Sequence, residues 1–180
     1  HAAAGGMGLI LCQWAKALGA TIVGTVSTPE KADVAKAAGC HFPVVRSEKS
    51  FVEVVREVTD NEGCAVVYEA IGKDTLQASL DTLRPMGTCA AYGHVSGPPD
   101  PVDVIQDLGR RGSLFITRPA IMHYVAKRSD LEWTARDLFK AIGDKVISAN
   151  INYEYELKDA VQAHTAIESG KTLGASVLIP

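Results

Sequence analysis

The stretch that decides the fold opens the chain: His1-Ala2-Ala3-Ala4-Gly5-Gly6-Met7-Gly8, followed by an apolar helical segment at residues 9–18. Gly19 is a helix-ending signal, and residues 21–26, Thr-Ile-Val-Gly-Thr-Val, form a β-branched run that is typical of a buried parallel strand. A turn, a helix and a strand in this order make up most of a βαβ unit. They predict a Rossmann-type sheet in which the glycine turn seats the pyrophosphate of a dinucleotide.

The glycines give this prediction its physical basis. A helix N-terminus offers free N–H groups and a partial positive charge, and both stabilise an anion. In the G-x-G-x-x-G fingerprint, the second glycine lets the pyrophosphate approach the backbone, and the third lets the helix pack closely on its strand. Gly5 and Gly8 take these roles, while Ala3 replaces the first glycine. Because a plain helix-capping loop shows the same pattern, the elements that follow must decide between the two.

Those elements alternate in the way that builds a parallel sheet. The strand that should lead into the glycine turn would lie before His1, so we expect an α/β, doubly wound parallel sheet whose first strand is missing from the chain. Residues 1–118 are the predicted nucleotide-binding domain. Residues 119–180 are predicted to form an α+β tail whose strands pair with an upstream catalytic domain. Strands are expected at residues 42–45, 65–68, 88–92, 113–117, 147–153 and 176–179, and helices at residues 30–38, 50–59, 74–83, 104–108, 130–142 and 158–169.

The residues after the second strand indicate which nucleotide is bound. NAD-binding folds usually carry an Asp or Glu about 20 residues beyond the glycines, where it holds the adenosine ribose. This chain has Thr25-Val26-Ser27 there, with Lys31 one turn into the next helix and Arg46 as a second cation. Small hydroxyls and a lysine suit a 2′-phosphate, which predicts NADPH; a solvated surface lysine is the alternative explanation of Lys31. The missing acid also argues against a methyltransferase.

The composition of the chain excludes several other classes of protein. The chain has 180 residues, 47% of them hydrophobic, and a formal net charge of −3, so it can bury a real core. It shows no basic stripe and no apolar run near the roughly 20 residues of a membrane span, so we expect neither nucleic acid nor membrane as a partner. The four cysteines have no zinc-ligand spacing, which predicts no metal and a soluble, cytoplasmic protein.

Several motifs in a fixed order carry a resemblance that covers the whole chain. Besides residues 1–25, they are Val67-Tyr68-Glu69-Ala70-Ile71-Gly72, Leu80-Asp81-Thr82-Leu83-Arg84-Pro85, Gly112-Ser113-Leu114-Phe115-Ile116-Thr117-Arg118-Pro119 and the closing Gly174-Ala175-Ser176-Val177-Leu178-Ile179-Pro180. The chain resembles the NADPH:quinone oxidoreductase (zeta-crystallin-like) branch of the medium-chain dehydrogenase/reductase superfamily. Members are typically zinc-independent homodimers that pass hydride from NADPH to quinones or related α,β-unsaturated carbonyls. The resemblance implies this chemistry for the intact protein, with this chain as its cofactor-binding part.

The resemblance also implies site residues, which lie beyond the carboxyl ends of the strands. No catalytic residue is assigned, and the proton donor would be water or a group of the upstream domain. The sequence departs from the family pattern at Glu69, where an aspartate is common, at Arg46, where a tyrosine often stands, and at Gly170, a basic position that Lys171 could replace. The implied cofactor contacts are Gly5, Gly6, Met7 and Gly8 for the pyrophosphate, Ser27, Lys31 and Arg46 for the 2′-phosphate, Ala70 and Ile71 for the nicotinamide ribose, Tyr92, Gly93 and His94 beside the nicotinamide, and Phe115 and Ile116 for its carboxamide.

Two other functions stay open at this point. A zinc alcohol dehydrogenase or an enoyl reductase shares the cofactor domain, and the residues that would distinguish them lie mainly upstream. A non-catalytic NADPH-binding or structural protein would carry the same motifs. The apolar strand at residues 113–117, as a sheet edge, predicts a homodimer.

Overall fold

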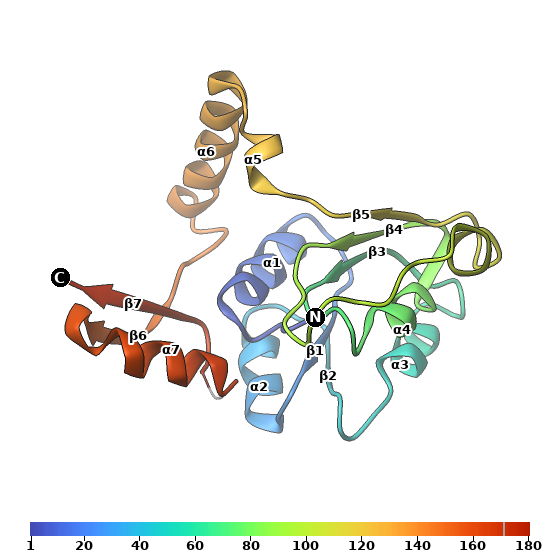
Figure 1. Cartoon of the computed structure of the whole chain (residues 1–180), viewed down its shortest axis with the longest axis horizontal. Helices are drawn as coiled ribbons and strands as arrows, with labels where there is room; N and C mark the ends of the chain where they lie inside the picture. Colours follow the sequence, from blue (N-terminus) through green and yellow to red (C-terminus); the bar gives the residue numbers. More distant parts are fainter. Residues whose placement is uncertain (171) are drawn as a thin grey trace. The chain divides into compact units, whose positions relative to one another are not determined.

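The computed structural model describes residues 1–170 and 172–180 (Figure 1). Lys171, one of the expected phosphate contacts, lies outside the described residues. Helices and strands alternate over most of the chain, and all the strand ladders are parallel. The α/β fold with parallel sheets that the sequence predicts is therefore confirmed.

The chain forms two compact units, which we describe separately. The N-terminal unit comprises Ala2–Val45 and Leu138–Pro180, and the central unit comprises His1 and Arg46–Asp137. The sequence predicts a different division, near residue 118, between a cofactor domain and a segment that packs on an upstream domain. That division stays a prediction.

In the N-terminal unit, α1 (Gly6–Ala17) precedes β1 (Val23–Val26). The helix α2 (Pro29–Ala37) then connects β1 to its parallel partner β2 (Phe42–Val45), which completes a βαβ unit. The Thr28 hydroxyl accepts the Lys31 N–H, and Pro29 occupies the first turn, which together start α2 as helix-capping rules expect. The core is made of small side chains that let helix and strand approach closely: Ala3, Ala4, Cys12, Val26, Ala35 and Cys40.

The C-terminal part of the same unit holds β6 (Ile151–Glu156) and β7 (Ala175–Ile179). The structure pairs them with each other, and their further pairing with an upstream domain stays a prediction. The short 3₁₀ helix η2 (Leu157–Asp159) and α7 (Ala160–Glu168) provide the crossover that a parallel pair requires. Gly174 N–H donates to the Ala4 carbonyl at 2.9 Å, so the start of β7 is attached to the glycine turn.

In the central unit, three parallel strands lie in the order β3 (Cys64–Glu69), β4 (Leu83–Ala91) and β5 (Phe115–Thr117). The unit also contains α3 (Phe51–Val58) and α4 (Leu76–Leu80). Glu69 pairs with Ala91, so β3 and β4 end at the same edge of the sheet. Within the described strands, β5 pairs with β4 alone and is therefore an edge strand. The core of the unit consists of Leu76, Leu80, Leu83, Cys89 and Leu114.

Two elements of the central unit differ from the prediction. The expected strand at residues 88–92 begins earlier, at Leu83, which pairs with Cys64 and is buried in the core, and this shortens α4. Residues expected to form a short ordinary helix form a π-helix, η1 (Val104–Gly109). Its N-terminus is capped by Asp103, whose carboxylate accepts the N–H groups of Ile105 and Gln106 at 2.8 Å.

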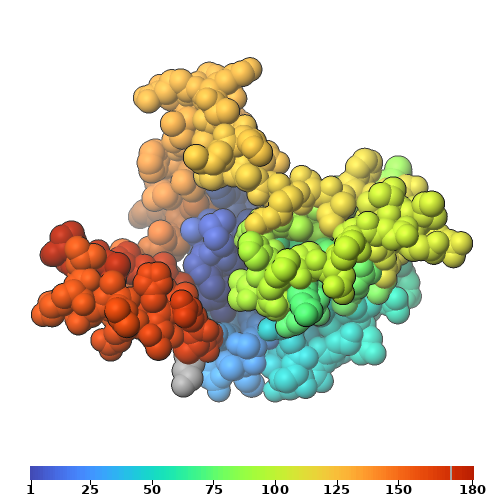
Figure 2. Space-filling model, in the orientation of Figure 1, coloured from blue at the N-terminus to red at the C-terminus, as the bar shows by residue number. Residues whose placement is uncertain are grey.

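Two helices follow β5: α5 (Ile121–Tyr124), which the sequence did not predict, and α6 (Arg128–Gly143). Their large apolar side chains are mostly exposed, and Figure 2 draws the segment that holds them in yellow to orange. These side chains are Ile121, Met122, Tyr124, Trp133 and Phe139. Among the helices of the described residues, we find none with the length and hydropathy needed to cross a bilayer.

Candidate functional site

The glycine turn of the N-terminal unit leads into the N-terminus of α1, where no side chain of the first turn takes the place of a bound anion. Gly5 is the N-cap, in extended conformation, and neither a side-chain cap nor an acidic residue lies in the first turn. Since the first N–H groups of a helix have no acceptor within it, they are available to an external anion. Gly8 has no room for a side chain, because a Cβ there would lie 2.2 Å from the Ala2 carbonyl oxygen. The turn thus fits the pyrophosphate site that the sequence predicts.

This turn lies at the carboxyl end of β1. Ala3 N–H donates to the Thr25 carbonyl at 3.0 Å, and a Cβ on Gly24 would lie 2.7 Å from the Ala3 Cβ. Ser27 follows β1 directly and is exposed, while the exposed Met7 lies in the first turn of α1. The structure therefore brings the glycine turn and the β1–α2 connection to the same end of one strand.

Lys31 is held in this connection by two contacts. Its backbone N–H donates to the Thr28 hydroxyl at 3.3 Å, and its ammonium donates to the Gly170 carbonyl at 2.5 Å. Gly170 has a φ of +67°, a left-handed conformation that favours glycine. An ammonium has three donors, so this bond leaves two for an anion. Gly170 stands where the family pattern has a basic residue, and here its carbonyl orients the Lys31 ammonium. Arg46 is exposed just after β2.

In the central unit, two segments beyond the strand ends form one hydrogen-bonded surface. We call residues 69–72, which begin at the last residue of β3, the nicotinamide turn, after the contact that the resemblance predicts for them. Residues 92–97, after β4, are the facing loop. Tyr92 and Gly93 donate to the Glu69 carbonyl at 2.9 and 3.2 Å. Val95 donates to the Ala70 carbonyl at 3.2 Å, and Ser96 donates to the Ile71 carbonyl at 2.8 Å. The predicted contacts Ala70, Ile71, Tyr92, Gly93 and His94 are therefore brought together.

Two glycines make this close approach possible. A Cβ on Gly93 would lie 2.4 Å from the Ala70 carbonyl oxygen. Gly72 has a φ of +92°, and a Cβ there would lie 2.6 Å from the Gly97 carbonyl oxygen. Ala70 and Ile71 are buried, whereas His94 is exposed. The backbone of the facing loop thus fits against the nicotinamide turn only because both contact points lack side chains.

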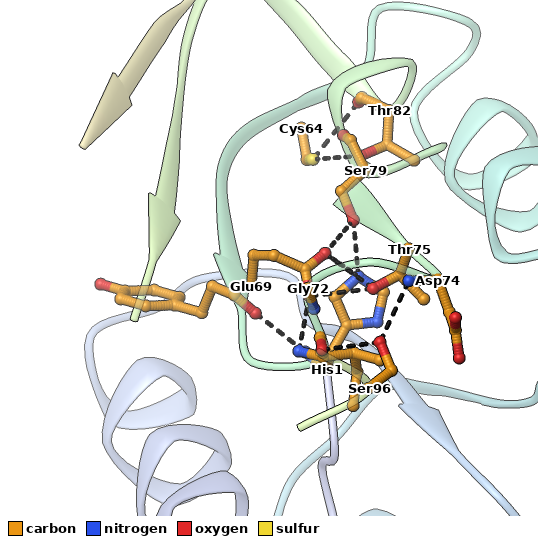
Figure 3. Close-up of polar contacts among 11 residues, drawn as sticks. His1, Cys64, Glu69, Gly72, Asp74, Thr75, Ser79, Thr82 and Ser96 are labelled. Atoms are coloured by element: carbon orange, nitrogen blue, oxygen red, sulfur yellow. Dashed lines mark hydrogen bonds and ion pairs between the residues drawn. The ribbon is translucent and has the colours of Figure 1, made fainter. Parts of the chain in front are cut away.

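The buried carboxylate of Glu69 holds the nicotinamide turn through hydrogen bonds (Figure 3). One oxygen of Glu69 accepts the N–H groups of Ile71 and Gly72 at 2.7 and 3.1 Å. The Thr75 hydroxyl lies 2.9 and 3.0 Å from the two carboxylate oxygens and donates its single hydrogen between them, and the Ser79 hydroxyl donates at 2.5 Å. The His1 Nε2 lies 3.3 Å away. Glu69 is thereby fully paired although no part of it is exposed.

This carboxylate also affects its neighbours. Burial, and secondarily the charge of Glu69, raises the pKa of the half-buried Tyr92 phenol. Burial and the same charge raise the pKa of the Cys89 thiol to about 12. Both groups are therefore neutral near pH 7, and Tyr92 is a hydrogen-bonding group rather than a charge.

The third predicted segment lies next to β4. Phe115 pairs with Thr88 and Ile116 with Cys89, so both lie before the edge where Tyr92 begins the facing loop. The residue of this segment that reaches the facing loop is Arg118. Its guanidinium donates to the Ala91 carbonyl at 3.0 Å and lies 3.4 Å from the His94 Nδ1. Backbone contacts from Phe115 and Ile116 to a carboxamide stay a prediction.

Sequence reasoning missed part of this surface. It noted Glu69 only as a departure from a family pattern and gave no role to Ser96, whose hydroxyl donates to the Ile71 carbonyl and accepts the Asp74 N–H. A usable signal was present: an acidic residue that ends an apolar strand is followed by Thr75 and Ser79 on the next helix. In the described residues, no group of three or more His, Cys, Asp or Glu side chains is arranged to hold a metal ion.

Comparison with known proteins gives the family. Residues 6–138 match the family described as zinc-binding dehydrogenase. The chain belongs to this family. The match includes the last three residues of the glycine turn, Gly6, Met7 and Gly8, and all of the nicotinamide turn and the facing loop. The resemblance to the medium-chain dehydrogenase/reductase superfamily that we drew from the motifs is thereby confirmed.

Individual relatives narrow the similarity. The chain is 52% identical over 180 residues to a 2-haloacrylate reductase of Burkholderia sp, and the aligned region covers all of this chain and 54% of that protein. It is 45% identical to a quinone oxidoreductase of Salmonella typhimurium, with 55% of that protein covered. A crystal structure of Escherichia coli quinone oxidoreductase complexed with NADPH superposes with a TM-score of 0.94 at 42% identity, covering all of this chain and 56% of that one. The chain thus spans about half the length of the curated relatives it matches.

Proposed function

We propose that the chain is the cofactor-binding part of an NADPH-dependent reductase that transfers hydride to a quinone or a related α,β-unsaturated carbonyl. The observation that carries the proposal is the N-terminus of α1, which has neither a capping side chain nor an acid in its first turn, beside a lysine held at the end of β1. The likeness to quinone oxidoreductases, one of them solved with NADPH, supports it.

The residues of the N-terminal unit would bind the phosphates. Gly5, Gly6, Met7 and Gly8 present backbone N–H groups of the α1 N-terminus to the pyrophosphate. Lys31 offers its two remaining donors to the 2′-phosphate, with Ser27 as a further contact. Arg46, which begins the central unit, stays the second predicted cation for this phosphate. The chain has no acidic residue among Thr25, Val26 and Ser27 to hold an unphosphorylated ribose, which favours NADPH over NADH.

The residues of the central unit would orient the reactive ring. NADPH, when bound, supplies the hydride. Ala70 and Ile71 present a buried turn to the nicotinamide ribose, and Tyr92, Gly93 and His94 line the facing loop. Phe115 and Ile116 offer backbone groups to the carboxamide. Fixing the ring in this way is the main contribution a protein makes to hydride transfer, because orientation removes much of the entropic barrier.

The acceptor class rests on chemistry that the named relatives share. A quinone and a 2-haloacrylate both contain a carbon–carbon double bond activated by an adjacent carbonyl or carboxylate, which draws electron density from the carbon that receives hydride. The reductase of the second compound is 52% identical to this chain, so 2-haloacrylates are a specific second candidate. The zinc alcohol dehydrogenase alternative predicts reduction of an aldehyde, and the non-catalytic alternative predicts NADPH binding without turnover.

One set of assays separates these alternatives. Purified full-length protein is mixed with NADPH and, in turn, with 1,4-benzoquinone, 2-chloroacrylate or a simple aldehyde, and the loss of the reduced nicotinamide absorbance is followed. We expect turnover with the first or second acceptor and none with the aldehyde. Aldehyde reduction that a zinc chelator abolishes would support the zinc dehydrogenase alternative, and NADPH binding without turnover of any acceptor would support the non-catalytic one.

Two further properties belong to this proposal. The edge strand β5 exposes 60% of Phe115, which supports a homodimer formed through the end of the sheet. A monomer in light scattering over a wide concentration range would contradict it. All four cysteines are free thiols, as is typical of a reducing compartment, and this supports a cytoplasmic location.

A further inference from the structure

We propose that Glu69 is a positioning residue, whose carboxylate fixes the nicotinamide turn and, through it, the facing loop, so that the nicotinamide half of NADPH meets a preformed surface. This inference rests on the proposed function and names a residue that acts without touching the reacting atoms. It is carried by the direction of the hydrogen bonds around the carboxylate and by the backbone bonds that join the two segments (Figure 3).

The pocket around Glu69 is built for a carboxylate. The N–H groups of Ile71 and Gly72 can only donate, and they converge on a single oxygen. The Thr75 and Ser79 hydroxyls also donate to the carboxylate. A glutamine in this place could keep its oxygen on the two N–H groups, but its NH2 group would then face the Thr75 and Ser79 hydroxyls. Both hydroxyls would have to turn from donating to accepting, so the present donor arrangement fits an acceptor with two oxygens better than an amide.

The imidazole ring of His1 lies beside the carboxylate. The His1 Nε2 lies 3.3 Å from Glu69 and 2.8 Å from the Ser79 hydroxyl oxygen, and 3% of the His1 side chain is exposed. The His1 ring packs edge-on against Phe51, with the ring centres 5.0 Å apart, and its backbone nitrogen donates to the Tyr68 carbonyl at 3.0 Å. A buried carboxylate is tolerated only where partners of this kind compensate for its lost hydration.

The fixed turn determines the position of the facing loop. The carbonyls of Ala70 and Ile71 accept N–H groups from the facing loop, and each lies in the same peptide plane as an N–H group that the carboxylate holds. The Ser96 hydroxyl adds a bond to the Ile71 carbonyl at 2.9 Å. If the N–H groups of Ile71 and Gly72 lost their acceptor, these planes could rotate and the loop would lose its register. The expected consequence is a misplaced nicotinamide surface.

Two ligands separate this role from a general effect on stability. NADPH requires both the phosphate residues and the nicotinamide surface, whereas adenosine 2′,5′-bisphosphate lacks the nicotinamide half and requires only the phosphate residues. We expect Glu69→Gln in the full-length protein to weaken NADPH binding by about tenfold or more, and to leave the affinity for the bisphosphate unchanged. The kcat with the acceptor should fall as well at saturating NADPH, since the ring is misoriented.

Three variants complete the test. Glu69→Asp keeps the charge and should restore most of the NADPH affinity. Thr75→Val removes one donor at nearly constant volume, should shift NADPH binding in the same direction but less, and replaces Glu69→Gln if that variant does not fold. Glu57→Gln is the matched control, because Glu57 is exposed and its carboxylate pairs with the exposed Lys49 at 2.8 Å. Its affinities should equal those of the parent.

The outcomes are distinct. Selective loss of NADPH affinity in Glu69→Gln, with recovery in Glu69→Asp, supports the positioning role. Equal weakening of both ligands, or of neither, overturns it while leaving the reductase proposal intact. A parent protein that binds neither ligand overturns the proposed function, and the inference with it.

Discussion

Replacing Gly93 by alanine should separate the nicotinamide turn from the facing loop. The added Cβ would lie 2.4 Å from the Ala70 carbonyl oxygen and 2.9 Å from the Ala70 Cα. Both are backbone atoms, so the clash cannot be relieved by a side-chain rotation. The two segments must move apart by at least ~0.6 Å to reach the 3.0 Å below which such contacts essentially never occur.

The size of the effect follows from the contacts at this point. Overpacking of this kind costs about 1–3 kcal/mol. The separation also weakens the bonds from Gly93 to the Glu69 carbonyl and from Val95 to the Ala70 carbonyl, each 3.2 Å long and each worth about 1 kcal/mol. We therefore expect the free energy of unfolding to fall by about 2–4 kcal/mol, a large part of the 5–15 kcal/mol that is usual for a domain.

Chemical denaturation of Gly93→Ala and of the parent protein measures this difference directly. Gly143→Ala is the control, because a Cβ at this helical position meets nothing within 4 Å and should leave stability unchanged or slightly raised. NADPH affinity should fall in Gly93→Ala and stay constant in the control. If Gly93→Ala were as stable as the parent and bound NADPH equally well, the close approach of the two segments would be refuted.

Other predictions concern the N-terminal unit and the buried thiols. Gly8→Ala should weaken NADPH binding and lower the melting temperature, because its Cβ would lie 2.2 Å from the Ala2 carbonyl and 2.7 Å from Ala3, which displaces the turn from α1; calorimetry on this variant checks both, and unchanged values would contradict the packing described. The pKa of the Cys89 thiol is raised from its ordinary 9.0 to about 12 mainly by burial, so the unfolded thiol ionises first and the free energy of unfolding should fall as pH rises from 9.0 toward 12. Denaturation at several pH values tests this, and Cys89→Ala should show a shallower decline.

The sequence predicts the parallel α/β pattern well because its signals are local. The glycine turn, the helix-ending Gly19 and the β-branched run before Ser27 each specify an element within a few residues. The prediction fails where distant contacts decide the structure. Leu83 joins β4 because its side chain fills the core opposite Cys64, which the helical pattern expected at residues 74–83 does not reveal.

The site shows the same division. The sequence predicts which residues surround the nicotinamide turn, because the carboxyl ends of parallel strands meet at one edge. It could not show that Gly170 orients Lys31, since these residues are far apart in the chain and the contact uses a backbone carbonyl. The pairing of Glu69 with His1, Thr75 and Ser79 likewise depends on the folded core rather than on a spacing rule.

The central claim is that this chain recognises NADPH through the glycine turn and Lys31. A calorimetric titration with NADPH and with NADH, on the parent protein and on Lys31→Ala, tests it most directly, with the exposed Lys36→Ala of the same helix as the control. We expect the parent and the control to bind NADPH about ten to a hundred times more tightly than NADH, and Lys31→Ala to lose this preference while its NADH affinity stays constant. Equal binding of the two nucleotides by the parent, or a preference that survives in Lys31→Ala, would contradict the claim.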